Sequence, residues 1–114
     1  NGDNSWAQTE TLGASEAFYI EDNTFTYNHS GGGSADSQFA NDGQAGGRWV
    51  MRFNTNTNHK FHSHGADSGG RQRGIRQMEL YENASTYNLG MNVSTHFTSR
   101  GGVAMVWDNT VTLS

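Results

Sequence analysis

Large apolar residues alternate with polar residues over short runs of this chain, which is the pattern of half-buried β-strands. The clearest run covers 48–54. Its large apolar side chains fall on one face, and they are Trp49, Met51 and Phe53. The opposite face carries Arg48 and Arg52. This run therefore predicts a strand with one face in the core and one charged face.

Weaker signals of the same kind predict further strands over 16–20, 24–27, 58–64, 75–82 and 87–97. The first two flank Asp22 and Asn23, which favour a turn or bulge, so they form either one hairpin or one bent strand. The run 75–82 fits neither the helical nor the strand period well, and we favour a strand.

The C-terminal segment has the signature of a β-hairpin. Val103, Met105 and Trp107 alternate up to Asp108-Asn109, a pair suited to a two-residue type I′ turn. Val111 and Leu113 would form the returning strand. Because Trp107 is in phase with these apolar neighbours, it is expected in the core.

The remaining segments read as loops. Residues 28–47 are rich in Gly and are expected to form a flexible loop, and residues 1–15 an extended arm or donated strand. We see no internal repeat of solenoid length. Six to eight short strands in a single domain of 114 residues predict an all-β fold, specifically an antiparallel, jelly-roll-like β-sandwich.

Composition limits the chemistry and the compartment. The chain has 15 Gly, no Pro and no Cys, so disulfides and thiolate metal sites are excluded. No apolar run approaches the length needed to span a membrane, and the first residue is Asn1 instead of Met, which favours a processed or excised segment. We expect an extracellular or virion location.

Charge is segregated along the chain. Residues 1–47 contain seven acidic residues and no Lys or Arg, whereas six of the seven basic residues lie between Arg48 and Arg76. This separation favours head-to-tail contact between an acidic and a basic surface, so it predicts a homo-oligomer or contact with other virion or filament subunits. The net charge of −4 opposes nucleic-acid binding.

Three arginines, Arg71, Arg73 and Arg76, lie within six residues of one another. Together they could bind a phosphate, sulfate or carboxylate group, because guanidinium groups pair with such anions. The interpretation that we favour is plainer, namely a basic face that pairs with the acidic segment of another copy.

Histidines offer the best candidate metal ligands. His62 and His64 are two residues apart, so a strand would project both imidazoles from one face, and both could bind a divalent transition metal. Asp67, His29 or His96 could complete the site. The alternative is that these histidines are ordinary exposed polar residues, and we otherwise expect no cofactor.

Aromatic side chains suggest sugar binding, and the candidates are Trp6, Trp49, Tyr81 and Trp107. Core packing is the better expectation for Trp49 and Trp107, whereas Trp6 lies in a polar segment and is expected to be exposed. No Gly-x-Ser-x-Gly motif is present, and the acids Glu79 and Glu82 would face opposite sides of a strand. We therefore expect no enzymatic activity.

Two short stretches resemble known families. The sequence Gly-Gly-Arg-Trp at 46–49, with 58–62 and 65–67, resembles a segment of bacteriophage tailspikes and tail fibres, where such a strand precedes a β-helix. The His-x-His strand resembles the iron-binding tips of phage fibres, in which trimers share the metal. Residues 102–113 resemble the final hairpin of jelly-roll carbohydrate-binding modules.

These observations lead to one main hypothesis and two alternatives. The main one is a non-catalytic β module that assembles, either as a phage virion component or as an extracellular filament subunit. A secreted carbohydrate-binding module or lectin that binds a glycan through exposed aromatics is the first alternative. A metal-dependent enzyme at His62 and His64 is the second.

Overall fold

The computed structural model describes residues 12–28, 39–66, 74–88 and 96–114, and this part of the chain is built from short β-strands. In chain order they are β1 (Phe18–Glu21), β2 (Thr24–Thr26), β3 (Phe39–Gly43), β4 (Arg48–Arg52), β5 (Thr55–Thr57), β6 (Lys60–Ser63), β7 (Gln77–Tyr81), β8 (Ala84–Tyr87), β9 (Phe97–Thr98), β10 (Val103–Trp107) and β11 (Thr110–Leu113). The all-β expectation is confirmed. No helix in the described residues is long and apolar enough to cross a membrane.

The strands form three sheets, and every strand pair in the described residues is parallel. Sheet A has the order β1-β4-β7-β10, sheet B β2-β5-β8-β11, and sheet C β3-β6-β9. The predicted antiparallel jelly-roll sandwich is therefore wrong. Alternation of apolar residues identifies a strand, but it does not say in which direction the neighbouring strand runs.

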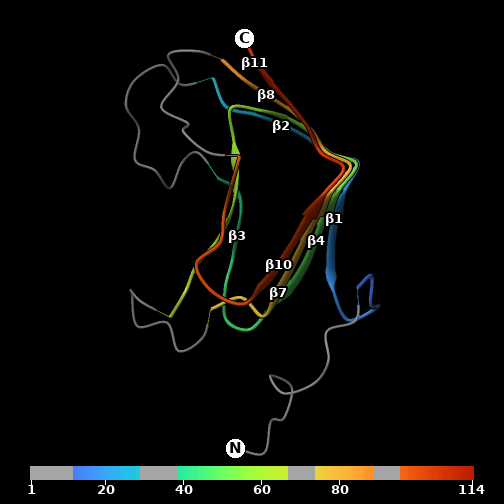
Figure 1. Ribbon diagram of the computed structural model, residues 1–114, viewed down its shortest axis with the longest axis vertical. Helices are drawn as coiled ribbons and strands as arrows, with labels where there is room; N and C mark the ends of the chain where they lie inside the picture. The colour runs from blue at the N-terminus through green and yellow to red at the C-terminus, as the bar shows by residue number, and fades with distance from the viewer. Residues whose placement is uncertain (1–11, 29–38, 67–73, 89–95) are drawn as a thin grey trace, which may run out of the picture.

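Consecutive strands belong to different sheets, so the chain winds as a coil. Figure 1 looks along the stack of coils, and the strands of each sheet overlap to form three sides of the coil. Each complete coil contributes one strand to each sheet, and the fourth contributes β10 and β11 to sheets A and B. This architecture is a parallel β-helix, in which each coil packs only against its neighbours.

The corner between sheets A and B is made by one residue with positive φ in each coil. These residues are Asp22 (58°), Phe53 (57°), Glu82 (52°) and Asp108 (49°). A left-handed residue turns the strand through a corner instead of reversing it. The predicted C-terminal hairpin is therefore wrong, because Asp108 directs β11 into sheet B. Likewise, 16–27 is one bent strand instead of a hairpin.

An asparagine follows each of these corner residues, and the four asparagines stack as a ladder consisting of Asn23, Asn54, Asn83 and Asn109. They are separated by 31, 29 and 26 residues. The chain thus has a repeat of solenoid length, contrary to the expectation from sequence. The loops between strands differ in length and sequence, and they hide the repeat.

The core lies inside the coil, where Met51, Phe61 and Leu80 are fully buried. Leu80 pairs with Val106 in the last strand, so Val106 faces inward and Trp107 faces outward. The expectation that Val103, Met105 and Trp107 face the core is wrong. Their alternation is real, but these side chains lie on the outer face of sheet A.

The segment 28–47, expected to be a flexible loop, contains β3. This strand pairs with β6, and a β-bulge lies between Phe39 and Asn41. The sequence of β3, Phe-Ala-Asn-Asp-Gly, has low β-propensity. Its strand conformation therefore depends on pairing with a neighbouring coil, which short-range sequence patterns do not show.

Candidate metal centre

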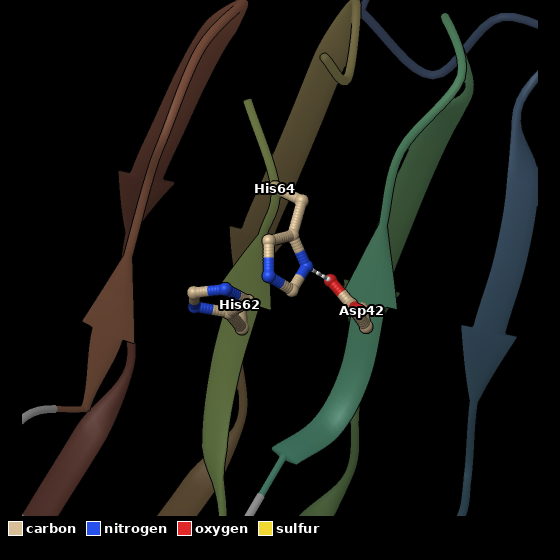
Figure 2. Close-up of side chains that lie close together, drawn as sticks. All are labelled: Asp42, His62 and His64. Carbon is tan, nitrogen blue, oxygen red and sulfur yellow. Dashed lines mark hydrogen bonds and ion pairs between the residues drawn. The ribbon is translucent and has the colours of Figure 1, made fainter. Parts of the chain in front are cut away.

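Sheet C brings two histidines and an aspartate together on its outer face (Figure 2). Phe61 points into the core, so His62 points outward, and His64 follows on the same side two residues later. Asp42 of β3 is paired in register with His62 of β6. The three side chains therefore come from two neighbouring coils.

The ligand atoms of these three side chains all lie within 4.8 Å of one another. His64 Nδ1 and Asp42 Oδ1 are in direct contact as a hydrogen-bonded pair. The imidazole rings of His62 and His64 have centroids 4.6 Å apart and meet edge to face at 84°. The cluster therefore has the size of a site for one ion.

His62 is the most buried member, with 4% of its surface exposed. Its ring is stacked on Phe39 at 4.1 Å, and within the described residues neither ring nitrogen has a hydrogen-bond partner. Burial is the main cause that lowers the pKa of His62 to about 4, and the neighbouring His64, Lys60 and Arg100 act in the same direction. His62 is therefore neutral near pH 7, and a neutral imidazole is the form that binds metals.

Solvent reaches this cluster from the aspartate side. The Asp42 side chain is 34% exposed, and that of His64 is 11% exposed. An ion could thus enter beside the carboxylate and meet the buried imidazole of His62 behind it. This arrangement excludes water from the His62 imidazole and leaves the Asp42 carboxylate accessible.

Two imidazoles and one carboxylate suit a borderline transition metal such as Zn²⁺, Co²⁺, Ni²⁺ or Fe²⁺ better than Ca²⁺ or Mg²⁺, which prefer oxygen ligands. Ligand atoms on a tetrahedral zinc are about 3.3 Å apart, given Zn–N distances of ~2.0–2.1 Å. The observed spread requires only small side-chain rotations to reach that separation. Three protein ligands would leave at least one coordination position for water.

Sequence reasoning identified two of the three members. His62 and His64 lie together, as their i, i+2 spacing predicted, but Asp42 was missed because its segment has no strand pattern. His96 lies elsewhere, where its Nδ1 is 3.0 Å from the Tyr87 hydroxyl. The other two candidate ligands, His29 and Asp67, lie outside the described residues.

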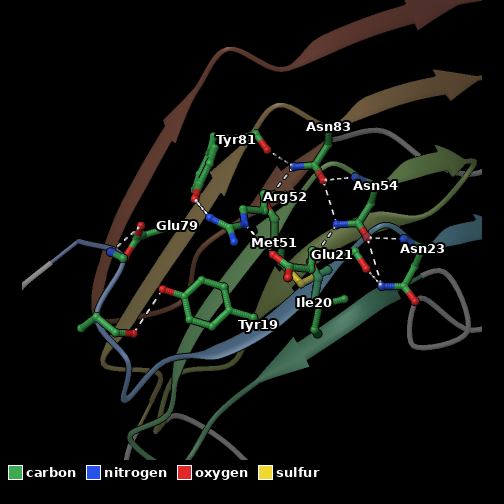
Figure 3. Close-up of polar contacts among 12 residues, drawn as sticks. Tyr19, Ile20, Glu21, Asn23, Met51, Arg52, Asn54, Glu79, Tyr81 and Asn83 are labelled. Carbon is green, nitrogen blue, oxygen red and sulfur yellow. Dashed lines mark hydrogen bonds and ion pairs between the residues drawn. The ribbon is translucent and has the colours of Figure 1, made fainter.

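The basic residues do not form one free surface within the described part of the chain. Arg52 donates a hydrogen bond to Tyr81 and forms a 2.6 Å ion pair with Glu21 of the same chain (Figure 3), and these two contacts raise its pKa. Arg76 is 4% exposed. Arg71 and Arg73 lie outside the described residues. The charge pattern suggested that basic and acidic residues pair between copies, but Arg52 pairs with Glu21 of its own chain.

Among the aromatic candidates for sugar binding, Trp107 is the one whose position differs from the sequence expectation. Trp107 is stacked on Tyr81, with centroids 4.2 Å apart, so one of its faces is occupied. Trp49 meets Phe18 edge to face at 5.0 Å. Trp6 lies outside the described residues. These aromatic candidates thus contact other aromatic rings across neighbouring strands.

The chain matches no protein-family model, and comparison with curated proteins and with solved structures found no significant similarity. Any function must therefore be argued from the geometry of the chain itself.

Proposed function

We propose that this chain is a structural β-helix module that binds one divalent transition-metal ion through Asp42, His62 and His64. The observation that carries the proposal is the state of His62. Both of its ring nitrogens are buried and have no hydrogen-bond partner among the described residues, although buried polar atoms in proteins are nearly always hydrogen-bonded. A metal ion in contact with one of them would remove that cost.

The ion would act mainly as a cross-link. Asp42 belongs to the first coil, and the two histidines belong to the second. Binding would join β3 to β6, and β3 is a strand whose own residues have low β-propensity. Because the site forms only when both coils are folded, the free energy of metal binding would stabilise the folded state. This role requires no chemistry on a substrate.

The direct test is titration of the metal-free protein with Zn²⁺ by calorimetry and with Co²⁺ by visible absorption. Wild type should bind one ion, and Co²⁺ should give the d–d bands of a low-coordinate nitrogen and oxygen site. His62→Ala should weaken Zn²⁺ affinity by more than the ~10–100-fold that loss of an outer-sphere partner costs. Asp42→Ala should have a similar effect.

His59→Ala is the matched control. His59 lies in the second coil near His62, but its ring packs on Phe25 and Tyr27, away from the site. This variant should bind Zn²⁺ as wild type does. The proposal is wrong if wild type shows neither Zn²⁺ heat nor Co²⁺ bands, or if His59→Ala and His62→Ala weaken binding equally.

A further inference from the structure

Within the described residues, the stack of coils has two edges whose strands are paired on one side. At one end, β1 and β2 pair with β4 and β5, and at the other, β10 and β11 pair with β7 and β8. We call these the N-edge and the C-edge. Since every strand is parallel, the two edges present the same backbone direction, and one could extend the other by simple translation. Open edges of this kind are templates for pairing.

The C-edge is markedly apolar. Most of the exposed large hydrophobic residues in the described chain belong to β10 and β11, and these are Val103 (46%), Met105 (42%), Val106 (46%), Val111 (47%) and Leu113 (71%). Val106 follows the inward-facing column Ile20, Met51 and Leu80, yet it is 46% exposed, since no described strand pairs with β10 on its other side. The described residues thus leave this inward-facing column uncovered at the C-edge.

The asparagine ladder leaves unmatched groups at both edges of the described stack; Figure 3 shows its members Asn23, Asn54 and Asn83. Along the stack, each backbone N–H donates to the Oδ1 of the next asparagine, at 3.0 Å from Asn23 to Asn54, 3.1 Å from Asn54 to Asn83 and 3.0 Å from Asn83 to Asn109. In the described residues, no acceptor faces the Asn109 N–H. Likewise, no donor from the described residues reaches Asn23 Oδ1.

The side-chain amides of the ladder also link neighbouring coils, but they donate toward the N-edge. Asn54, Asn83 and Asn109 each donate from Nδ2 to a carbonyl of the preceding coil, namely Ile20, Met51 and Leu80. If this pattern continued, the next asparagine would donate to the Val106 carbonyl. The C-edge thus offers one donor and one acceptor, and Asn23 at the N-edge has the amide that matches both.

The columns of side chains continue across the same junction. If β1 were placed next to β10 in the existing register, Ile20 would lie beside Val106. In sheet B, Phe25 would lie beside Val111. Apolar inward-facing residues would then meet apolar inward-facing residues, and the core would run on from one copy into the next.

At the other end of the stack, the described turn before β1, residues 12–17, does not lie along the N-edge. Gly13 N–H donates to Glu79 Oε1 at 2.9 Å, and the Tyr19 hydroxyl donates to the Ala14 carbonyl. Glu79 belongs to β7, two strands into sheet A, and lies on the outer face. The turn therefore packs against the outer face of sheet A and does not lie along the unpaired edge of β1.

We propose that the N-edge of one copy docks on the C-edge of a second copy, so that sheets A and B and the asparagine ladder run continuously through a head-to-tail stack. The partner is a second copy because one edge supplies the hydrogen-bonding groups and the apolar column that the other lacks. Such a contact is heterologous and does not close, so it generates filaments. This inference goes beyond metal binding and does not require it.

Wild-type protein should show a mean mass that rises with concentration in light scattering. Electron microscopy should show unbranched filaments, and oriented samples should diffract at the strand spacing of ~4.7–4.9 Å along the filament axis. High salt should not dissolve the filaments, because apolar burial and backbone hydrogen bonds form the contact. Assembly that disappears in salt would instead indicate the charge pairing expected from sequence.

Two proline variants block one edge each without removing a described hydrogen bond. Tyr27 N–H donates to Thr57, so the N–H of Thr26 points away from β5 and into the N-edge. Thr110 and Ser114 donate to sheet B, so the N–H of Val111 points into the C-edge. Thr26→Pro and Val111→Pro should therefore each remain monomeric alone.

An equimolar mixture of the two variants provides the decisive measurement. Each retains the edge that the other has lost, so the mixture should form a dimer of twice the monomer mass and stop there. Thr26→Val and Val111→Thr keep both N–H groups and should still form filaments. Circular dichroism and Zn²⁺ titration report on folding of the variants independently of assembly.

Three results would overturn the stacking proposal. Wild type could stay monomeric at every soluble concentration, folded proline variants could assemble as wild type does, or the mixture could show no dimer. None of these results would affect the metal site, since Asp42, His62 and His64 lie on the outer face of sheet C. Conversely, loss of Zn²⁺ binding in His62→Ala should leave filament formation unchanged.

Discussion

His62 shows how a single side chain can be costly for the fold and useful for a ligand. Its imidazole contacts the rings of Phe39 and His64, and its pKa is lowered to about 4, mainly because burial disfavours the charged form, while Asp42 acts in the opposite direction. Without a metal ion, the two ring nitrogens lack partners and reduce stability. With an ion, one of them becomes a ligand that is already neutral.

This residue predicts a pH dependence of stability in the metal-free protein. The pKa of His62 falls from 6.5 in the unfolded chain to about 4 in the fold, so the unfolded state takes up a proton first as pH decreases. The free energy of unfolding should be highest above pH 6.5 and fall by roughly 2–3 kcal/mol between pH 6.5 and 4. Lowering of the His96 pKa by burial adds to the same trend.

Urea denaturation in the presence of a chelator at several pH values measures this dependence. The Gln side chain of His62→Gln does not titrate, so this variant should show a shallower slope, to which His96 still contributes. An identical slope in wild type and His62→Gln would contradict the assignment.

Individual strands in this protein are short, and the corners between them hold the elements in place. Asn54 is 1% exposed and bridges two corners, because it accepts from Asn23 N–H, donates to the Ile20 carbonyl at 2.9 Å and contacts Asn83. A short strand such as β5 (Thr55–Thr57) has few hydrogen bonds of its own. The ladder therefore fixes the register of sheets A and B together.

Asn54→Ala should lower the free energy of unfolding by about 2–3 kcal/mol, because the buried groups that it satisfies would be left without partners. Asn23→Ala is the matched comparison at the N-edge. Asn23 is exposed, and among the described residues its amide donates to Glu21 and Asn54 alone, so we expect a loss of about 0.5–1 kcal/mol. Denaturation of dilute protein measures both, and equal losses would argue against the ladder as a register device.

At the scale of the whole molecule, stability depends on position in the stack. In the part of the chain that the structure describes, β4 and β7 have a neighbouring strand on both sides, whereas β1 and β10 have one. Val50, Met51 and Leu80 are fully buried, but the residues of β10 and β11 are largely exposed. A stack of coils with nearest-neighbour contacts should open from its ends.

Amide hydrogen exchange of dilute protein should therefore be slowest in β4 and β7 and fastest in β2 and β11. Zn²⁺ should add protection mainly in β3 and β6, which the proposed ion joins. Uniform exchange through all four coils, or fastest exchange in β4 and β7, would contradict this account.

The sequence by itself determined the strand content, the inward face of Trp49 and Met51, and the proximity of His62 and His64. These follow from short-range alternation, which depends only on residues near in the chain. The strand predicted over 48–54 ends at Arg52, and Phe53, expected in the core, is a corner residue that is 46% exposed. Parallel pairing, the asparagine ladder and the third site member Asp42 were decided only by tertiary structure. Each of them joins residues about 20 to 30 positions apart, and the loops between coils differ enough in length to conceal the spacing. A corner residue such as Asp108 can end a strand in a hairpin or a bend, and only the coil already beneath it decides which.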